Sequence, residues 1–114
     1  MSTRATILIK SKEDDEQVYV YHHSDGFPNS IGVDMKEYLS ALKPYEWDVY
    51  EIANGLIKGY CGDDRWYELT NCQHGDEEFA YLIDVDAQTI KCYSIGCDDF
   101  NWPKAEKEVE IPEY

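Results

Sequence analysis

The first thirty residues divide into two apolar segments and two turn-forming segments. Residues 5–10 and 17–23 are rich in β-branched and aromatic side chains, so both are predicted to be strands. The charged residues 12–16 separate them, which predicts a hairpin. Asp, Gly, Pro and Asn then gather in residues 24–29, a composition typical of a turn.

Apolar residues next recur at intervals of three and four, the spacing of one helix face. A first helix is predicted to start at Asn29 or Ser30, both good N-caps, and to run to about residue 42. A second is predicted to begin at Trp47 or Asp48 and to end at Gly59.

The second half of the chain returns to strand-like patterns. Residues 66–70, 78–85 and 89–95 are predicted strands, and the last two are joined by a tight turn. The acidic tail, residues 98–114, contains two prolines and is expected to be extended. The order β-β-α-α-β-β-β predicts a single α+β domain over residues 1–114, an antiparallel sheet of about five strands with two helices on one face.

Charge changes this picture most. Acidic residues outnumber basic ones by 24 to 10, so the formal net charge is −14 on 114 residues. A domain of this length has a radius of gyration of about 13 Å and a diameter of roughly 35 Å. Duplex DNA carries about one charge per 1.7 Å, or ~20 charges over that length. Because the totals are comparable, the charge predicts a protein that competes with nucleic acid for a basic groove. It also disfavours direct binding to DNA, RNA or acidic membranes.

The amount and distribution of apolar residues argue against a disordered protein and against a membrane-spanning one. With 43% hydrophobic and 14% aromatic residues, the chain is expected to fold rather than stay disordered. No segment approaches the ~20 apolar residues of a membrane span. The first residues lack the apolar core of a signal peptide. We therefore expect a cytoplasmic protein whose four cysteines are reduced thiols.

Two motifs in the first third of the chain carry a resemblance. Residues 1–7 read Met-Ser-Thr-Arg-Ala-Thr-Ile, and residues 23–28 read His-Ser-Asp-Gly-Phe-Pro, followed by Ile31 and Gly32. Together they resemble a group of short, largely uncharacterised proteins encoded by bacteriophages and prophages. The resemblance implies a mobile-element origin, an α+β fold and a place in the cytoplasm of the host cell, and it transfers no catalytic residue. Small acidic phage proteins recur as inhibitors of host nucleic-acid enzymes, including anti-CRISPR proteins that mimic DNA.

The first functional hypothesis is therefore an inhibitor that occupies the basic groove of a nucleic-acid-binding host protein, such as a CRISPR effector, without cofactor or catalysis. Its contacts are expected to be acidic loop residues and neighbouring aromatic side chains that anchor the interface. These residues are Asp63, Asp64, Trp66, Asp76, Glu77, Glu78, Asp98, Asp99, Phe100 and Trp102. The protein is expected to be a monomer or a homodimer. A charge that only maintains solubility is the alternative.

A second hypothesis is a small metal-dependent hydrolase or phosphodiesterase. Histidine as a residue type ionises near neutral pH, so His23 is a candidate acid or base that Asp25 is placed to orient, while Asp84 and Asp86 share one strand face as a metal-binding pair would. The alternative is that residues 23–28 have only a structural role as a turn, because Asp and Gly are common turn residues.

The cysteines raise the question of zinc. Cys61, Cys72, Cys92 and Cys97, with His74, supply enough nitrogen and sulfur donors for a tetrahedral site. The paired short Cys-x2-Cys spacing of zinc ribbons is missing, however, and Cys92 lies within a predicted strand. Ordinary thiols are the favoured interpretation, and no metal site is predicted.

Overall fold

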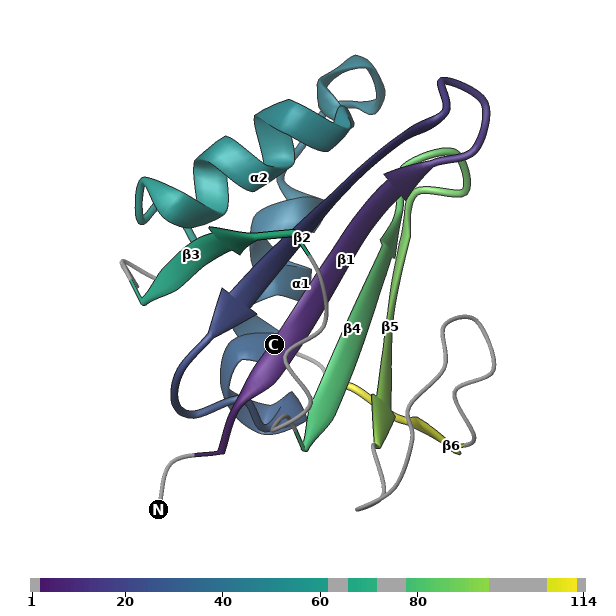
Figure 1. Cartoon of the computed structure of the whole chain (residues 1–114). Helices are drawn as coiled ribbons and strands as arrows, with labels where there is room; N and C mark the ends of the chain where they lie inside the picture. Colours follow the sequence, from purple (N-terminus) through teal and green to yellow (C-terminus); the bar gives the residue numbers. More distant parts are fainter. Residues whose placement is uncertain (1–2, 62–65, 72–77, 95–106, 113–114) are drawn as a thin grey trace.

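The computed structural model describes residues 3–61, 66–71, 78–94 and 107–112, which form a six-stranded sheet with two α-helices (Figure 1). The strands are β1 (Ala5–Ser11), β2 (Glu16–His22), β3 (Tyr67–Thr70), β4 (Phe79–Asp84), β5 (Thr89–Ser94) and β6 (Lys107–Val109). The helices are α1 (Val33–Ser40) and α2 (Val49–Ile57). A π-helical turn, Pro28–Gly32, precedes α1, and a 3₁₀ turn, Pro44–Glu46, precedes α2.

The predicted α+β class is confirmed, but the purely antiparallel sheet is wrong. The strand order is β3-β2-β1-β4-β5-β6, and β1 pairs in parallel with β4, with Ala5 opposite Phe79 and Lys10 opposite Asp84. Since β3 occupies the outer edge of β2, the edge of β1 is left for β4. Residues 5–9 of β1 are all buried, as expected of a strand flanked on both sides.

The predicted number of strands is also too small. Residues 107–109, in the acidic tail, form β6, which pairs antiparallel with β5 through Cys92 and Val109. The tail joins the sheet there because Val109 and Ile111 pack against the hydrophobic core. An expected extended segment is thus, in its described part, an edge strand.

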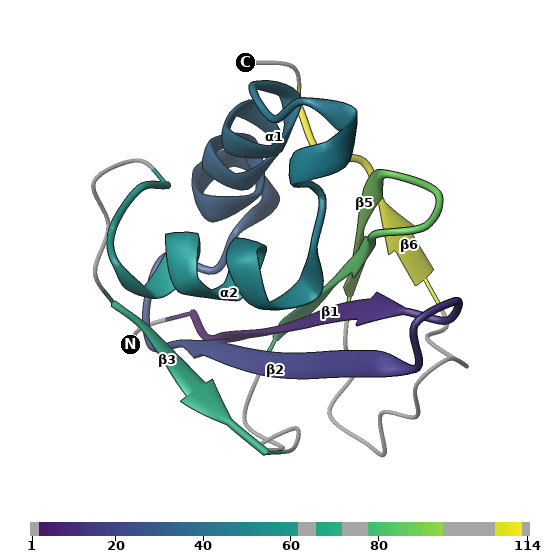
Figure 2. The same ribbon diagram turned by 90° about the horizontal axis from the view of Figure 1, so that it is seen from above.

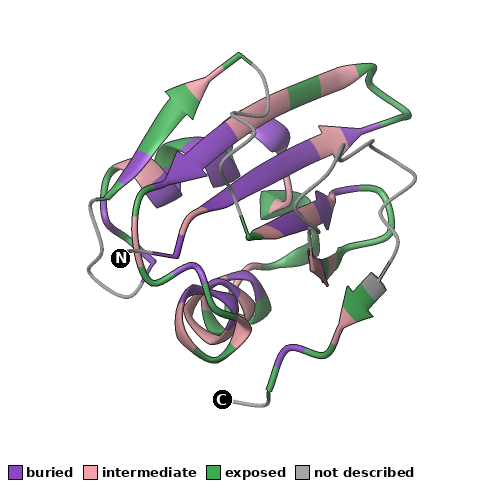
Figure 3. Cartoon of the chain, turned by 60° about the horizontal axis from the view of Figure 1, so that its bottom comes forward, coloured by how far each residue is buried: buried purple, intermediate pink, exposed green. Residues whose placement is uncertain are grey.

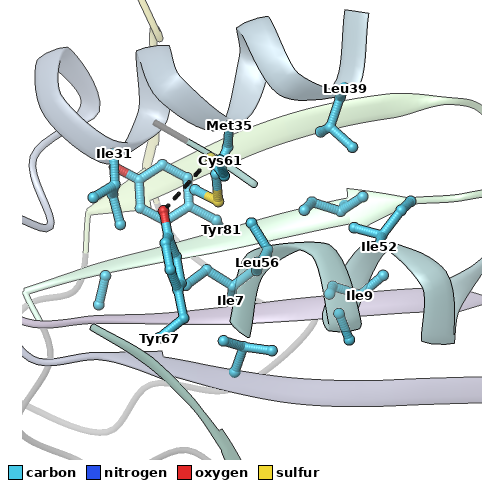
Figure 4. Packing of buried hydrophobic residues seen from close by; sticks show 14 of the residues in the cluster. Ile7, Ile9, Ile31, Met35, Leu39, Ile52, Leu56, Cys61, Tyr67 and Tyr81 are labelled. Atoms are coloured by element: carbon cyan, nitrogen blue, oxygen red, sulfur yellow. Dashed lines mark hydrogen bonds between the residues drawn. The ribbon is translucent and has the colours of Figure 1, made fainter. Parts of the chain in front are cut away.

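Both helices cover the same face of the sheet (Figure 2). Figure 4 shows Met35 of α1 and Ile52 and Leu56 of α2 near Ile7 and Ile9 of β1, and all five side chains are fully buried. Burying a side chain of this size contributes about 1.5–3 kcal/mol of hydrophobic free energy. The apolar faces predicted for both helices are therefore the faces that cover the sheet.

The opposite face of the sheet is also apolar at its centre. Thr6, Leu8, Tyr21 and Ala80, which alternate with the core-facing residues of their strands, are buried. Figure 3 shows the buried stretches of the sheet in purple. In the described part of the chain no helix lies over this face (Figure 2). Charged side chains appear on it toward the sheet edges, such as Glu68 on β3.

Candidate functional site

Two of the ten predicted contact residues lie in the described part of the chain. Trp66, directly before β3, is 67% exposed, and Glu78, directly before β4, is also exposed. The others lie outside the described residues; they are Asp63, Asp64, Asp76, Glu77, Asp98, Asp99, Phe100 and Trp102.

The strand residues next to these predicted contacts lie in one row across the sheet. Tyr67 pairs with His22, His22 with Ala5, Ala5 with Phe79, Phe79 with Ser94, and Ser94 with Lys107. We call this the terminal row. With neighbouring strands about 4.8 Å apart, it spans about 24 Å.

Each predicted acidic segment adjoins the terminal row in sequence or lies within five residues of it. Residues 63–66 precede Tyr67, residues 76–78 precede Phe79, and residues 98–102 lie between Ser94 and Lys107. Three segments far apart in the chain are therefore tethered to the same end of the sheet. Figure 1 shows the starts of β4 and β6 and the end of β5 at this end.

The turn that carries the phage-protein resemblance is held by backbone geometry. Asp25 has a φ of 54°, in the left-handed region, and the Gly26 amide donates to the Thr3 carbonyl at 2.9 Å. A Cβ on Gly26 would lie 2.9 Å from the Cβ of Ala5, so only glycine fits this close approach. The Tyr81 hydroxyl donates to the Gly26 carbonyl at 2.8 Å in a buried environment. These contacts fix the turn to β1 and β4.

His23 has a partner on the surface rather than within the turn. Its Nε2 lies 2.9 Å from Oε1 of Glu68 on β3, and both side chains are about half exposed. Its ring also meets the ring of Tyr21 edge-on, with centroids 4.8 Å apart. An exposed pair of this kind contributes little to stability.

Asp86 organises the turns at the other end of the sheet. Its Oδ1 accepts from the Ser11 hydroxyl at 2.8 Å, and its Oδ2 accepts from the amides of Lys12 and Glu13 at 2.7 and 3.2 Å. The Ser11 hydrogen bond, followed by those backbone donors, lowers the pKa of Asp86. Asp84 accepts from the Ala87 amide at 3.1 Å. Both carboxylates act as turn caps.

The four residues of the hydrolase hypothesis are not brought together. His23 and Asp25 follow the terminal row, whereas Asp84 and Asp86 lie beside Ser11, at the far end of β1. Seven strand residues separate these ends, a distance of about 20 Å. Among the described residues, no group of three or more His, Cys, Asp or Glu side chains is arranged to hold a metal ion.

Two of the cysteines are described, and both are buried free thiols in the hydrophobic core. The Cys61 sulfur lies 3.9 Å from the Tyr67 hydroxyl (Figure 4). Burial raises the pKa of the Cys92 thiol to about 12. Both therefore behave as small hydrophobic residues. Cys72, Cys97 and His74 lie outside the described residues.

The sequence interpretation missed a groove formed by α1, α2 and the 3₁₀ turn between them, which we call the tyrosine groove. Its volume is about 520 Å³. Its lining residues are Tyr38, Leu42, Tyr45, Glu46, Glu51, Asn54, Gly55, Lys58 and Tyr60. The ten tyrosines of the chain were a signal for such a site, but periodicity alone does not show which of them are exposed. Tyr45 is 79% exposed and Tyr60 69%.

Comparison of the chain with protein-family models, curated proteins and solved structures finds no match. No helix within the described ranges is long and apolar enough to cross a membrane.

Proposed function

We propose that this chain is an acidic binding protein that inhibits a nucleic-acid-binding protein by occupying its basic groove. The observation that carries the proposal is the terminal row, to which three acidic segments far apart in sequence are attached. The strand residues to which these segments are attached span about 24 Å, which is roughly two-thirds of the ~34 Å turn of duplex DNA.

Electrostatics supports a steric mechanism without turnover. The molecule measures 37 × 29 × 25 Å and carries a formal charge of −14. A field of this strength accelerates encounter with a cationic groove, and salt weakens it because charges are screened within about 8 Å at physiological ionic strength. Exposed Trp66 beside the terminal row supplies an apolar anchor for the docked complex.

The proposed partner class follows from charge and from the resemblance of the first third of the chain to phage-encoded proteins. A phage protein that mimics DNA is expected to act on host enzymes that bind DNA or RNA. A CRISPR effector is thus the first partner to test. Nucleases and other basic nucleic-acid enzymes of the host form the rest of the class.

The test compares two variants that lose the same charge at different ends of the sheet. D63N/D64N/D98N/D99N removes four charges from two of the three segments attached to the terminal row, and E13Q/D14N/D15N/E16Q removes four charges from the β1–β2 turn and the first residue of β2. Each has a net charge of −10, because four of the 14 excess negative charges are removed. Asn at position 15 suits the positive φ of that residue, 53°.

Tagged wild type and both variants are used to capture proteins from bacterial lysate, followed by elution with duplex DNA. We expect wild type and the turn variant to retain a basic nucleic-acid-binding protein that duplex DNA displaces. The variant of the terminal-row segments should retain little. Equal retention by both variants, failure of DNA to displace the partner, or capture of no such protein would each refute the proposal.

A further inference from the structure

The tyrosine groove combines aromatic surface and negative charge, independently of the terminal row. Tyr38, Tyr45 and Tyr60 supply three rings, and Glu46 and Glu51 supply two carboxylates. The volume of about 520 Å³ falls within the range of pockets that bind small ligands and side chains. Its chemistry differs from that of an apolar pocket, because each ring face and each carboxylate attracts a cation.

We propose that the tyrosine groove binds an arginine side chain of a basic segment in a partner protein. A guanidinium group stacks on aromatic rings and donates paired hydrogen bonds to carboxylates, so one planar cation contacts both the tyrosine rings and the carboxylates of the groove. Lysine presents a compact, strongly hydrated ammonium that cannot donate the paired, coplanar hydrogen bonds of a guanidinium. Arginine is therefore the better fit.

Gly55 shapes one wall of the groove. It lies inside α2, where glycine costs about 1 kcal/mol relative to alanine. A Cβ at this position would collide with the hydroxyl and ring of Tyr38. The missing side chain lets the Tyr38 side chain lie directly on the backbone of α2, and Glu51 and Asn54 of the same helix also line the groove.

The hydroxyl of Tyr38 keeps its proton. Burial first, and then the nearby Cys61, Glu51, Glu46 and Tyr60, raise the pKa of Tyr38. The phenol is therefore neutral and remains a hydrogen-bond donor.

Two lysines lie at the groove and offset the charge of its two carboxylates. Lys58 is the one basic residue among the lining residues, against Glu46 and Glu51. Lys43 lies over the Tyr45 ring, with its ammonium 5.9 Å from the centroid. This intramolecular contact shows that the ring is placed to accept a cation.

A second depression continues the surface beyond Tyr38 and Tyr60. Its volume is about 300 Å³, and its remaining lining residues are Asp34, Glu37 and Ala41. The two depressions together present four carboxylates against Lys58 and the neighbouring Lys43, so their net charge is 2 − 4 = −2. Such a surface accommodates a peptide with two neighbouring basic residues.

The test is an NMR titration of the whole ¹⁵N-labelled chain with the peptide acetyl-Gly-Arg-Gly-Arg-Gly-amide. A peptide with citrulline in place of arginine is the neutral control of the same shape. We expect saturable shifts centred on Tyr38, Glu51 and Asn54, with the citrulline peptide binding at least tenfold more weakly. Shifts centred elsewhere, or equal binding of the citrulline peptide, would overturn the proposal.

Variants separate the groove from general attraction to an acidic protein. E46Q/E51Q should weaken binding by about tenfold, or 1.4 kcal/mol. E13Q/D14N removes the same number of charges from the β1–β2 turn and should change binding less than about twofold. Y45A/Y60A should also weaken binding while the thermal midpoint stays unchanged, because both side chains are largely exposed. An equal effect of the two acidic double variants contradicts the proposal and leaves the terminal-row test unaffected.

Discussion

Replacing Tyr81 with Phe tests whether the turn at residues 23–28 is held by the core of the protein. Tyr81 is fully buried on β4, and its hydroxyl donates at 2.8 Å to the carbonyl of Gly26, 55 positions away in sequence. Burial raises the pKa of Tyr81, so the hydroxyl keeps its proton at any pH used for an unfolding experiment. Tyr81→Phe removes one oxygen and leaves the ring in place.

The expected loss has two parts. A neutral hydrogen bond contributes about 1 kcal/mol net, and leaving the buried Gly26 carbonyl without this donor adds about 1 kcal/mol more. The free energy of unfolding should therefore fall by about 2 kcal/mol. With an m-value of about 2 kcal/mol/M, the urea midpoint falls by about 1 M. The thermal midpoint of a domain this small falls by about 8 °C.

Urea unfolding followed by circular dichroism measures this difference, and Tyr50→Phe is the matched control. Tyr50 is 50% exposed, so its hydroxyl has water as an alternative partner, and its removal should change stability by less than about 0.5 kcal/mol. If Tyr81→Phe had as small an effect as Tyr50→Phe, the buried hydrogen bond would not hold the turn.

Three further predictions concern the acidic residues near the turns. The pKa of Asp86 is lowered, chiefly by the hydrogen bond from Ser11, so the stability that Asp86 contributes is complete above the unfolded pKa of 3.8 and is lost as the pH falls through the folded pKa. Asp86→Asn should therefore lower the thermal midpoint at pH 7 but hardly at pH 2. An equal loss at both pH values would contradict this. Partial burial, Asp48 and Asp14 raise the pKa of Glu16. Ionised Glu16 therefore destabilises the folded protein, an effect that is absent below the unfolded pKa of 4.5 and grows as the pH rises through the folded pKa. Glu16→Gln should raise the thermal midpoint at pH 7, less so in high salt, and a lowered midpoint would show the repulsion to be unimportant. Asp48→Ala removes the acceptor of two first-turn amides of α2, each at 3.1 Å, and should cost about 1 kcal/mol in urea unfolding, whereas Asp48→Ser should restore most of it.

Local sequence patterns predicted the helices and strands because their signals act over a few residues. Asp48 was expected at or next to the start of the second helix, and its side chain caps α2. The alternation within residues 78–85 predicted a strand, and Tyr81 and Ile83 face the helices while Ala80 and Leu82 face the other way. Hydrogen bonding and side-chain periodicity of this kind need no distant partner.

The arrangement of the strands was predicted less well because pairing depends on distant residues. Because β3 pairs with the outer edge of β2, the outer edge of β1 is the one open to β4, and no local pattern indicates this pairing or its parallel direction. One signal was present: the apolar run at residues 5–9 lacks alternation, which is typical of a strand inside a sheet. The position of β6 likewise depended on two apolar residues in an acidic tail.

The candidate sites show the same division. The acidic composition and the Asp-rich turns could be read from the sequence, and so could their preference for cationic partners. Whether two carboxylates meet could not, because Asp25 and Asp86 lie at opposite ends of a strand about 20 Å long. The tyrosine groove could not be predicted either, because its walls come from two helices and the turn between them, whose packing the sequence pattern does not show.

The sequence by itself thus determined the identity of most elements, the α+β class and the net charge of −14, which are set by local pattern and by composition. The tertiary structure alone decided which strand lies beside which, that Asp84 and Asp86 cap turns, and that Tyr38 packs on Gly55 to wall a groove. These features depend on contacts between residues far apart in the chain, or on the packing of one element against another. Such contacts form only when the hydrophobic core brings the elements together.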